Sequence, residues 1–467
     1  MKKEKVVDVV SNSARFIAQD DIHEKMHDKN LWNARVKRDR IAASIPEWEQ
    51  LRELGSAIKE HTLNHLDQYL EQFAANAEKR GAIVHWARTA QEHNEIVYSI
   101  LESHKVSSII KSKSMLQDEC GMVPFLEQHG IEVTESDLGE RIQQLSNEPP
   151  AHIVMPAIQK TTEDIARLFA EKIGTDPGNN DPTSLTEAMR NNARPRFMKA
   201  GAGMTGANFA IAETGTFVVC TNEGNADIGA SVPPLHIASI GIEKVIPKVR
   251  DLSIFIRLLS RSALGTPATQ YTSHFTGPRN GGELHIILTD NGRSERLAMK
   301  DFWRSLKCIR CGACMNTCPV YRRSGGLAYQ STYSGPIGII LSPTFDLKKY
   351  SELPFHSTLC GSCSQVCPMK IDLSDQIYKW REEVVKAGYM PKMRRLAFKA
   401  AGEIFAHPGQ FHLAENLGAK LLPIIPDFLV YSKLNPWTGG NDREMIRLAK
   451  PTFREWYLKN RKEQNNG

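Results

Sequence analysis

Cys308-x2-Cys311-x2-Cys314-x3-Cys318-Pro319 is the stretch that decides the fold of the second half of this chain, and a shorter run, Cys360-x2-Cys363-x3-Cys367-Pro368, follows it. Together the two runs hold seven of the nine cysteines. Thiolates at this spacing wrap around [4Fe–4S] clusters, and each Cys-Pro step turns the chain away from the cluster. The two runs therefore predict a protein that carries single electrons.

The crossed pairing found in two-cluster ferredoxins assigns these thiols to two clusters. In such proteins the fourth cysteine of each run ligates the cluster of the other run. By this rule the first cluster takes four thiolates, those of Cys308, Cys311, Cys314 and Cys367. The second cluster takes Cys318, Cys360 and Cys363 and is one thiolate short.

The missing ligand of the second cluster falls at Ser357 when the spacing is counted back from Cys360. Three alternatives stay open. Ser357 or an outside group completes a [4Fe–4S] cluster, although a serine oxygen is harder than a thiolate and suits iron less well. Otherwise the site holds [3Fe–4S], or one of the spare thiols, Cys120 or Cys220, supplies the ligand. A pair of zinc ribbons fits less well, because such ribbons need neither the third cysteine nor the Cys-Pro ending.

Composition limits the class of protein. A chain of 467 residues predicts two or three domains, and no apolar stretch reaches the roughly 18 residues that a membrane span needs. The first residues lack the apolar core of a secretory signal. Cysteines spaced for clusters belong in a reducing compartment, so we expect a cytoplasmic protein.

The net charge of +6 is concentrated near the C-terminus, because residues 391–467 carry 13 Lys and Arg against 7 Asp and Glu. Such a basic region suits a solvated helical face, an anionic surface or an acidic partner. Basic and aromatic residues do not interleave there, so a nucleic-acid partner is not expected.

Hydrophobic periodicity divides the chain into four parts. Residues 1–80 are predicted to be helical. Residues 81–300 alternate strand and helix, which predicts a mostly parallel sheet covered by helices. Residues 301–385 hold both cysteine runs between helical flanks, with a long insert that suits an α-helical ferredoxin. Residues 386–467 form the basic, helical C-terminal region.

Gly201-x-Gly203-x-x-Gly206 matches the dinucleotide-binding fingerprint letter for letter. That fingerprint needs a strand before it and a helix after it. Here a strand-like segment beginning at Asn208 follows instead. We therefore expect a glycine-rich bend beside a pocket, and no bound NAD or FAD.

Polar residues gather where predicted strands end. Glu213, Asn222 and Glu223 follow apolar strands, and Lys113 follows another. Ligands of open α/β sheets bind at the carboxyl ends of strands. These four residues therefore predict a pocket for a small carboxylate, or for a partner residue that takes its place. Ordinary turn chemistry explains the same residue types equally well.

Several longer segments resemble one family. Asp301-FWRSLKCIRCGACMNTCPVY, Thr358-LCGSCSQVCPMKI, Lys111-SKSM and Thr221-NEGNA are similar to the lactate-utilisation protein B family of iron-sulfur proteins. The resemblance implies a NagB/RpiA/CoA-transferase-like α/β domain, called the lactate-utilisation domain, followed by an α-helical ferredoxin domain. It also implies an iron-sulfur electron-transfer subunit of a cytoplasmic complex that oxidises L-lactate to pyruvate.

The resemblance further implies two partners. One is a cysteine-rich subunit similar to heterodisulfide-reductase components, and the other is a second subunit with a lactate-utilisation domain. The alternative function is a stand-alone enzyme of the CoA-transferase or sugar-phosphate-isomerase type. In that enzyme Glu213 would be the nucleophile or base, and the clusters would be structural.

Overall fold

The structure is a computed structural model that describes residues 5–19, 21–432 and 451–464, with residues 435, 438, 444, 445 and 449 between them. The chain divides into two compact units, Met1–Lys386 and Ala387–Gly467. The first unit contains both the α/β part and the cysteine runs. Each unit is described by itself below.

A parallel sheet organises the α/β part of the first unit. In the described chain it has six strands in the order β1-β10-β7-β4-β2-β3, and every neighbouring pair is parallel. This confirms the predicted mixed α/β class with a parallel sheet. The strands are β1 (Ile83–Ala87), β2 (Ser108–Lys111), β3 (Glu132–Glu135), β4 (Ala202–Thr205), β7 (Leu235–Gly241) and β10 (Glu283–Thr289).

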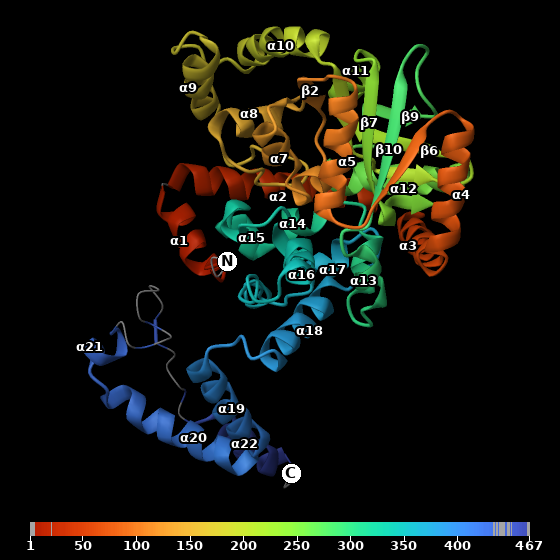
Figure 1. The fold of residues 1–467 in the computed structure, drawn as a ribbon. Helices are drawn as coiled ribbons and strands as arrows, with labels where there is room; N and C mark the ends of the chain where they lie inside the picture. The colour runs from red at the N-terminus through yellow and green to blue at the C-terminus, as the bar shows by residue number, and fades with distance from the viewer. Residues whose placement is uncertain are drawn as a thin grey trace. The chain divides into compact units, whose positions relative to one another are not determined.

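Helices connect and cover these parallel strands, as crossover connections require. Val97 and Leu101 of α5 and Leu126 of α7 are buried against Ile109 and Ile237 of the sheet, and α5 runs beside the sheet in Figure 1. The helices of the α/β part are α5 (Ala90–Ser103), α6 (Met115–Glu119), α7 (Met122–Gln128), α8 (Leu138–Ser146), α9 (Thr162–Ile173), α10 (Pro182–Lys199), α11 (Asn225–Ser231), α12 (Val249–Leu264) and α13 (Arg293–Ala298).

A second, smaller sheet packs beneath α12. Its order is β8-β5-β6-β9 among the described strands, with β5 and β6 joined as a hairpin. Phe209 of β5 packs on Phe255 of α12 with ring centroids 5.2 Å apart. The strands are β5 (Phe209–Ile211), β6 (Thr216–Thr221), β8 (Val245–Ile246) and β9 (Tyr271–Phe275).

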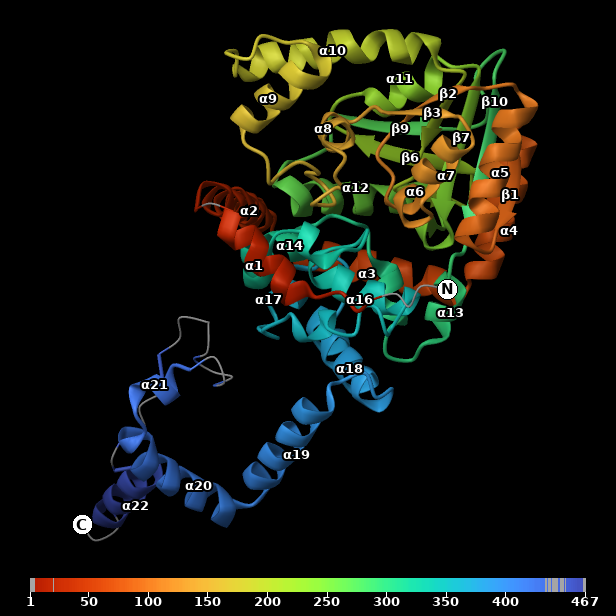
Figure 2. The same cartoon turned by 60° about the vertical axis from the view of Figure 1, so that its left-hand side comes forward.

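The N-terminal helices bridge the α/β part and the cysteine runs. α2 contacts α12 on one side and α14 of the cysteine segment on the other, and Figure 2 shows α1, α2 and α3 beside this segment. Arg38 of α2 and Arg52 of α3 are buried and donate to backbone carbonyls of the second cysteine run. The helices are α1 (Val9–Gln19), α2 (Asp21–Ala43), α3 (Trp48–Asn64) and α4 (Leu66–Lys79).

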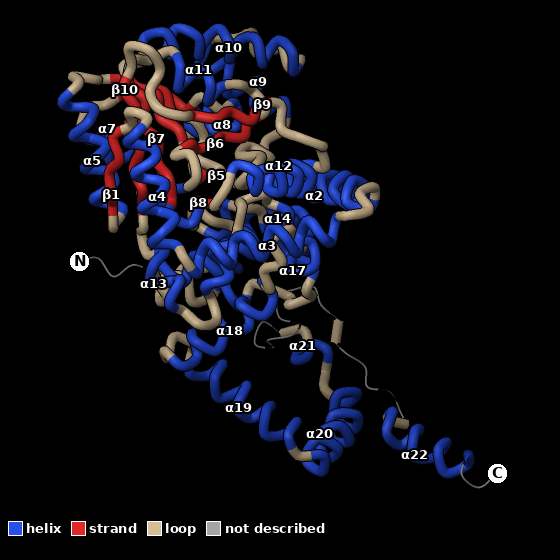
Figure 3. Tube along the Cα trace, turned by 90° about the vertical axis from the view of Figure 1, so that its right-hand side faces the viewer, coloured by secondary structure: helices blue, strands red, loops and turns tan. Residues whose placement is uncertain are grey.

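The cysteine segment is helical. Residues 301–386, all of them described, contain no strand, and Figure 3 shows strands only in the α/β part. The Trp380 indole donates to the Ile340 carbonyl at 3.0 Å and stacks on Phe302, which fastens the last helix to the segment. The helices are α14 (Ala313–Thr317), α15 (Pro319–Ser324), α16 (Gly335–Phe345), α17 (Ser362–Val366) and α18 (Leu373–Lys386).

The second unit consists of helices with many exposed apolar side chains. Ile424 and Phe428 are 76% and 74% exposed. Among the described residues, no helix combines the length and the apolar character that crossing a membrane requires. The helices are α19 (Lys392–Ala406), α20 (Pro408–Leu421), α21 (Asp427–Val430) and α22 (Phe453–Gln464).

Of the glycine-rich motif, Gly203 lies on the central strand β4, so the expectation of a bend is wrong at that residue, whereas Gly201 lies in a bend before the strand and Gly206 follows the strand and lines a cavity described below. Gly203 is the second residue of β4, with Met204 and Thr205 after it. A Cβ on Gly203 would overlap the carbonyl oxygen of Gly229 in α11. The glycine is therefore needed for close approach of a helix to the sheet. The phosphate-binding turn of a dinucleotide site is absent at this position.

We expect Gly203→Ala to destabilise the α/β part by about 1–3 kcal/mol, the usual cost of overpacking. Thermal unfolding should show a lower Tm. Gly229→Ala is the matched control from the other side of the same contact, because its Cβ would meet only Ile110 and Phe197 at 3.4 and 3.9 Å. Equal Tm values for the two variants would contradict this account.

Candidate cluster-binding site and adjoining pocket

The two cysteine runs fold as two copies of one turn-helix unit. Arg310 and Leu359, each just before a cysteine, have positive φ of 61° and 54°. The glycines after those cysteines, Gly312 and Gly361, have φ of 76° and 78°. A five-residue helix follows in each copy, α14 and α17, and these helices pack against each other. Cys-Pro ends both copies.

Four thiols lie together in the first group. Burial raises the pKa of Cys311, and the negative charges of Cys308 and Cys367 raise it further. Burial likewise raises the pKa of Cys314, with the charges of Cys308, Cys311, Cys363 and Cys367 adding to the effect. Cys367 thus lies near two thiols of the first run, Cys311 and Cys314, whereas Cys363 affects Cys314 alone of these two.

Three thiols form the second group. Burial raises the pKa of Cys363 to about 12, with contributions from the charges of Cys318 and Cys360. Burial raises the pKa of Cys318, and the negative charge of Cys360 adds to the effect. No cysteine is in a disulfide. Closely spaced, reduced thiols that repel one another when ionised are the donor set that iron-sulfur clusters require. The grouping supports the crossed assignment, which stays a prediction.

We expect Cys308→Ser and Cys367→Ser to damage the same cluster, because ligands of the first group come from both runs. Cys318→Ser should instead damage the cluster that depends on Cys360 and Cys363. The measurement is EPR of the dithionite-reduced protein. An identical loss of signal in Cys308→Ser and Cys318→Ser, with the other signal intact, would show that the crossing is absent.

Ser357 takes the place of Cys308 in the second copy. The Sγ of Cys308 accepts a hydrogen bond from the Arg310 N–H at 3.4 Å, and the Oγ of Ser357 accepts one from the Leu359 N–H at 3.2 Å. Both oxygen and sulfur thus point the same way within equivalent turns. This equivalence supports the count from the sequence that puts the missing ligand at Ser357.

The two spare thiols lie elsewhere. Cys120 ends α6 beside Glu119 and Arg293, and burial raises its pKa to about 12. Cys220 lies on β6 beside Thr269 and Thr272. Neither position groups these thiols with Cys360.

We expect Ser357→Cys to give the second site four thiolates and to leave or convert its cluster as [4Fe–4S], because a thiolate binds iron better than a hydroxyl does. Iron and sulfide counts with EPR provide the measurement. Ser357→Ala is the matched control, since it removes the oxygen and keeps the turn. If neither substitution changes iron content or EPR, another group already completes the site.

Two lysines, the buried Lys59 and the half-buried Lys244, lie near Cys308 of the first group. The Lys59 ammonium donates to the Val245 carbonyl at 3.3 Å and to the Glu243 carbonyl. Burial lowers the pKa of Lys59 to about 7 and that of Lys244 to about 8, while Glu243 and Cys308 oppose the effect for both. An ionised Cys308 therefore favours the protonated form of both lysines.

A charge network joins the α/β part to the cysteine segment. Arg293 donates to Glu119 at 2.8 and 3.1 Å and to Glu243 at 2.5 Å, and all three are buried or nearly so. The phenol of Tyr333 donates to Glu119 at 2.5 Å. Arg293 holds the pKa of Glu243 well below its usual range despite burial. Arg310 approaches Glu243 at 3.6 Å from the first cysteine run.

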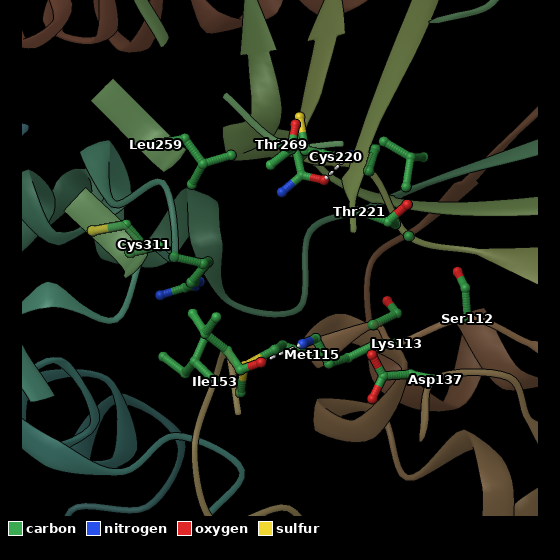
Figure 4. A pocket seen from close by; sticks show the side chains of 18 of the residues that line it. Ser112, Lys113, Met115, Asp137, Ile153, Cys220, Thr221, Leu259, Thr269 and Cys311 are labelled. Carbon is green, nitrogen blue, oxygen red and sulfur yellow. Dashed lines mark hydrogen bonds between the residues drawn. The ribbon is translucent and has the colours of Figure 1, made fainter. Parts of the chain in front are cut away.

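A cavity of about 330 Å³ opens beside this network. It lies between the carboxyl ends of β2, β6 and β7 and the loop of Arg310 and Cys311. Figure 4 shows Ser112, Lys113 and Asp137 on one side and Cys311 on the opposite side. The cavity therefore touches both the sheet and the first group of thiols.

The structure brings three of the four predicted pocket residues to this cavity. Lys113, Asn222 and Glu223 line it, and the Lys113 ammonium donates to the Val154 carbonyl at 3.0 Å. Glu213 does not line it. The Glu213 carboxylate accepts from the Val249 N–H at 2.9 Å, at the start of α12.

Sequence reasoning missed the cations that come from other parts of the chain. Arg310, Lys244 and Arg293 line the cavity, as do Glu243 and Tyr333. The position of Arg310 between two predicted ligand cysteines was a usable signal. Lys244 and Arg293 carry no such signal, because only tertiary packing brings them there.

Comparison with known proteins agrees with this architecture. The LUD domain family matches residues 70–296, and the 4Fe-4S dicluster domain family matches residues 304–371. The fold and the thiols thus define an iron-sulfur protein with a LUD domain.

Three relatives are named "Lactate utilization protein B". The protein from Bacillus cytotoxicus is 39% identical over 451 residues, which cover 91% of this chain and 92% of the relative. Those from Bacillus cereus and Bacillus anthracis are 38% identical over the same shares. The chain belongs to the lactate utilization protein B family, which confirms the resemblance seen in the sequence.

A solved structure of a DUF162 family protein from Deinococcus radiodurans covers 48% of this chain and 98% of its own, at 13% identity and a TM-score of 0.28. Similarity at that level carries no argument.

Proposed function

We propose that this chain is the iron-sulfur electron-transfer subunit of a complex that oxidises L-lactate to pyruvate. The observation that carries the proposal is the duplicated turn-helix unit, which gathers seven thiols into two groups. Relatives named for lactate utilization, similar over 91% of the chain, supply the metabolic context.

The thiols fit two clusters. Cys308, Cys311, Cys314 and Cys367 would hold one [4Fe–4S] cluster, and the second group, with Ser357, would hold [4Fe–4S] or [3Fe–4S]. A bound cluster supplies an acceptor and donor of single electrons. The chain's own contribution is to keep most of the thiols from water and to fix their loops. Arg52 does so by donating to the Cys367 carbonyl at 2.9 and 3.2 Å.

The proposal extends to domains and fold. We assign residues 1–80 to a helical region, 81–300 to the lactate-utilisation domain, 301–385 to an α-helical ferredoxin domain and 386–467 to the basic region. The parallel sheet with a smaller second sheet is compatible with a NagB/RpiA/CoA-transferase-like fold for the second of these.

We also propose a cytoplasmic location and two partner subunits, one cysteine-rich and similar to heterodisulfide-reductase components and one with a second lactate-utilisation domain. The exposed apolar side chains of the second unit, among them Phe398, Phe428 and Trp456, offer contact area for such a partner. The surplus of basic residues there favours an acidic partner surface.

The transferase or isomerase alternative is not favoured. It requires the Glu213 carboxylate to face a substrate pocket as nucleophile or base. That carboxylate instead accepts a backbone hydrogen bond at the start of α12, outside the lining of the cavity.

We expect anaerobically purified protein to contain about seven or eight irons per chain and clusters that dithionite reduces. In a reconstituted lactate-oxidising complex, Cys311→Ser should abolish electron transfer, whereas Glu213→Gln should leave it intact as the matched control. Clusters that dithionite cannot reduce would contradict an electron-transfer role. Turnover that persists after loss of the clusters would support the transferase alternative.

A further inference from the structure

Four buried polar atoms around the cavity between the sheet and the first cysteine run have no hydrogen-bond partner within the described chain. Buried polar groups in folded proteins are nearly always paired, so several unpaired atoms around one cavity indicate that something else satisfies them. The four are Ser112 Oγ, Thr221 Oγ1, Asn225 Oδ1 and Arg310 Nη1.

These atoms belong to residues that strands, a helix or a ring contact hold in place. Ser112 follows β2 and its N–H donates to the Met204 carbonyl at 2.9 Å, while Thr221 ends β6. Asn225 begins α11, and its amide nitrogen donates to Ser136 Oγ at 3.0 Å, which leaves its oxygen as an acceptor. Arg310 is held over the Tyr333 ring at 4.6 Å. Their geometry is therefore fixed before any ligand enters.

Four cationic side chains line the cavity, Lys113, Lys244, Arg293 and Arg310, against three carboxylates, Asp137, Glu223 and Glu243. The small positive surplus, together with the unpaired Nη1 of Arg310, favours an anion. Arg293 forms ion pairs with both Glu119 and Glu243, so its charge is already balanced and attracts an anionic ligand only weakly. Arg310, whose side chain is 10% exposed, has only a 3.6 Å approach to Glu243 and keeps Nη1 unpaired. Lys244 and Lys113 also line the cavity, and an ammonium with one acceptor still has further protons to donate.

We propose that this cavity binds a small 2-hydroxy- or 2-oxo-carboxylate, with the carboxylate on Arg310. The identification of L-lactate and pyruvate as ligands rests on the proposed function. Hydroxyls of Ser112 and Thr221 can donate hydrogen bonds to the ligand or accept them from it, and Asn225 Oδ1 can accept a hydrogen bond from a 2-hydroxyl group. A cavity of about 330 Å³ lies at the small end of ligand pockets.

The anchor and the thiols belong to one loop. Arg310 stands between Cys308 and Cys311 in the sequence, and Cys311 itself lines the cavity. A carboxylate on Arg310 would draw positive charge away from the neighbouring thiolates. Ligand binding should therefore alter the EPR signal of the first cluster without any change in iron content.

The test is calorimetric titration of the intact, cluster-loaded chain with L-lactate and with pyruvate, alongside methyl lactate, the uncharged methyl ester of lactate. Both acids should bind, and the ester should not. Arg310→Gln should weaken binding by about 10- to 100-fold, the usual effect of losing a charge-assisted hydrogen bond. Glu213→Gln is the control outside the cavity and should bind as the unaltered chain does.

Arg310 lies between Cys308 and Cys311, so Arg310→Gln can also change cluster binding. A second variant, away from the cysteine loop, then tests ligand binding. Ser112→Ala combined with Asn225→Ala removes two of the unpaired groups at a distance from the cysteine loop and should weaken binding by roughly 10-fold. Iron content is measured for every variant.

Two results would overturn the proposal. One is an unaltered chain with full, reducible clusters that binds neither acid; the proposed electron-transfer role would then stand without this site. The other is unchanged affinity in both variants, which would mean that Arg310 only balances the charge of the thiolates. A chain without reducible clusters would instead count against the proposed function itself.

Discussion

Mutual repulsion of buried thiolates is the constraint on which the first unit depends. Burial and neighbouring charges raise the pKa values of Cys311, Cys314 and Cys363, so the folded chain disfavours the ionised forms that metal binding requires and holds their protons more tightly than free thiols do. Metal binding must displace those protons, and its free energy then adds to that of folding. The packing of α14 on α17, the hydrogen bonds of Arg38 and Arg52 to the second cysteine run, and the buried Lys59 near Cys308 all help to hold such charges together.

The Arg293 network links that metal-dependent region to the sheet. Buried ion pairs seldom stabilise a fold much more than apolar packing would, but removal of one partner leaves a buried charge and costs about 3–5 kcal/mol. Glu119 and Glu243 come from the α/β part, whereas Tyr333 and Arg310 come from the cysteine segment. This polar network thus joins the two parts beside the cavity, in addition to the apolar core that they share.

Local spacing explains what the sequence could predict. The two cysteine runs, and the missing cysteine at Ser357, can be predicted from the spacing of cysteines in the sequence. The parallel sheet can be predicted from the alternation of strand and helix patterns. Lys113 reached the cavity because it follows β2, whose carboxyl end lies at the edge of the parallel sheet where ligands bind. Asn222 and Glu223 follow β6, an antiparallel strand of the smaller sheet, so that rule does not explain their position. Glu213 did not reach the cavity, because it lies in the turn between β5 and β6 and its hydrogen bonds go to the backbone of Pro247 and Val249, where β8 leads into α12. The strand at Gly203 and the cation Lys244 depended on contacts between distant segments, which no local pattern records.

Water does not reach the thiols equally. Cys360 is exposed, whereas Cys311, Cys314, Cys363 and Cys367 are buried. Oxidation of cysteine follows access and thiolate character, so dissolved oxygen and peroxide meet the second group first. Cys360 is also the thiol of this group that is most accessible to a redox partner. The protein thus combines a sheltered site beside the cavity with an outward-facing one, and sensitivity to air is the consequence of the access that the outward-facing site provides.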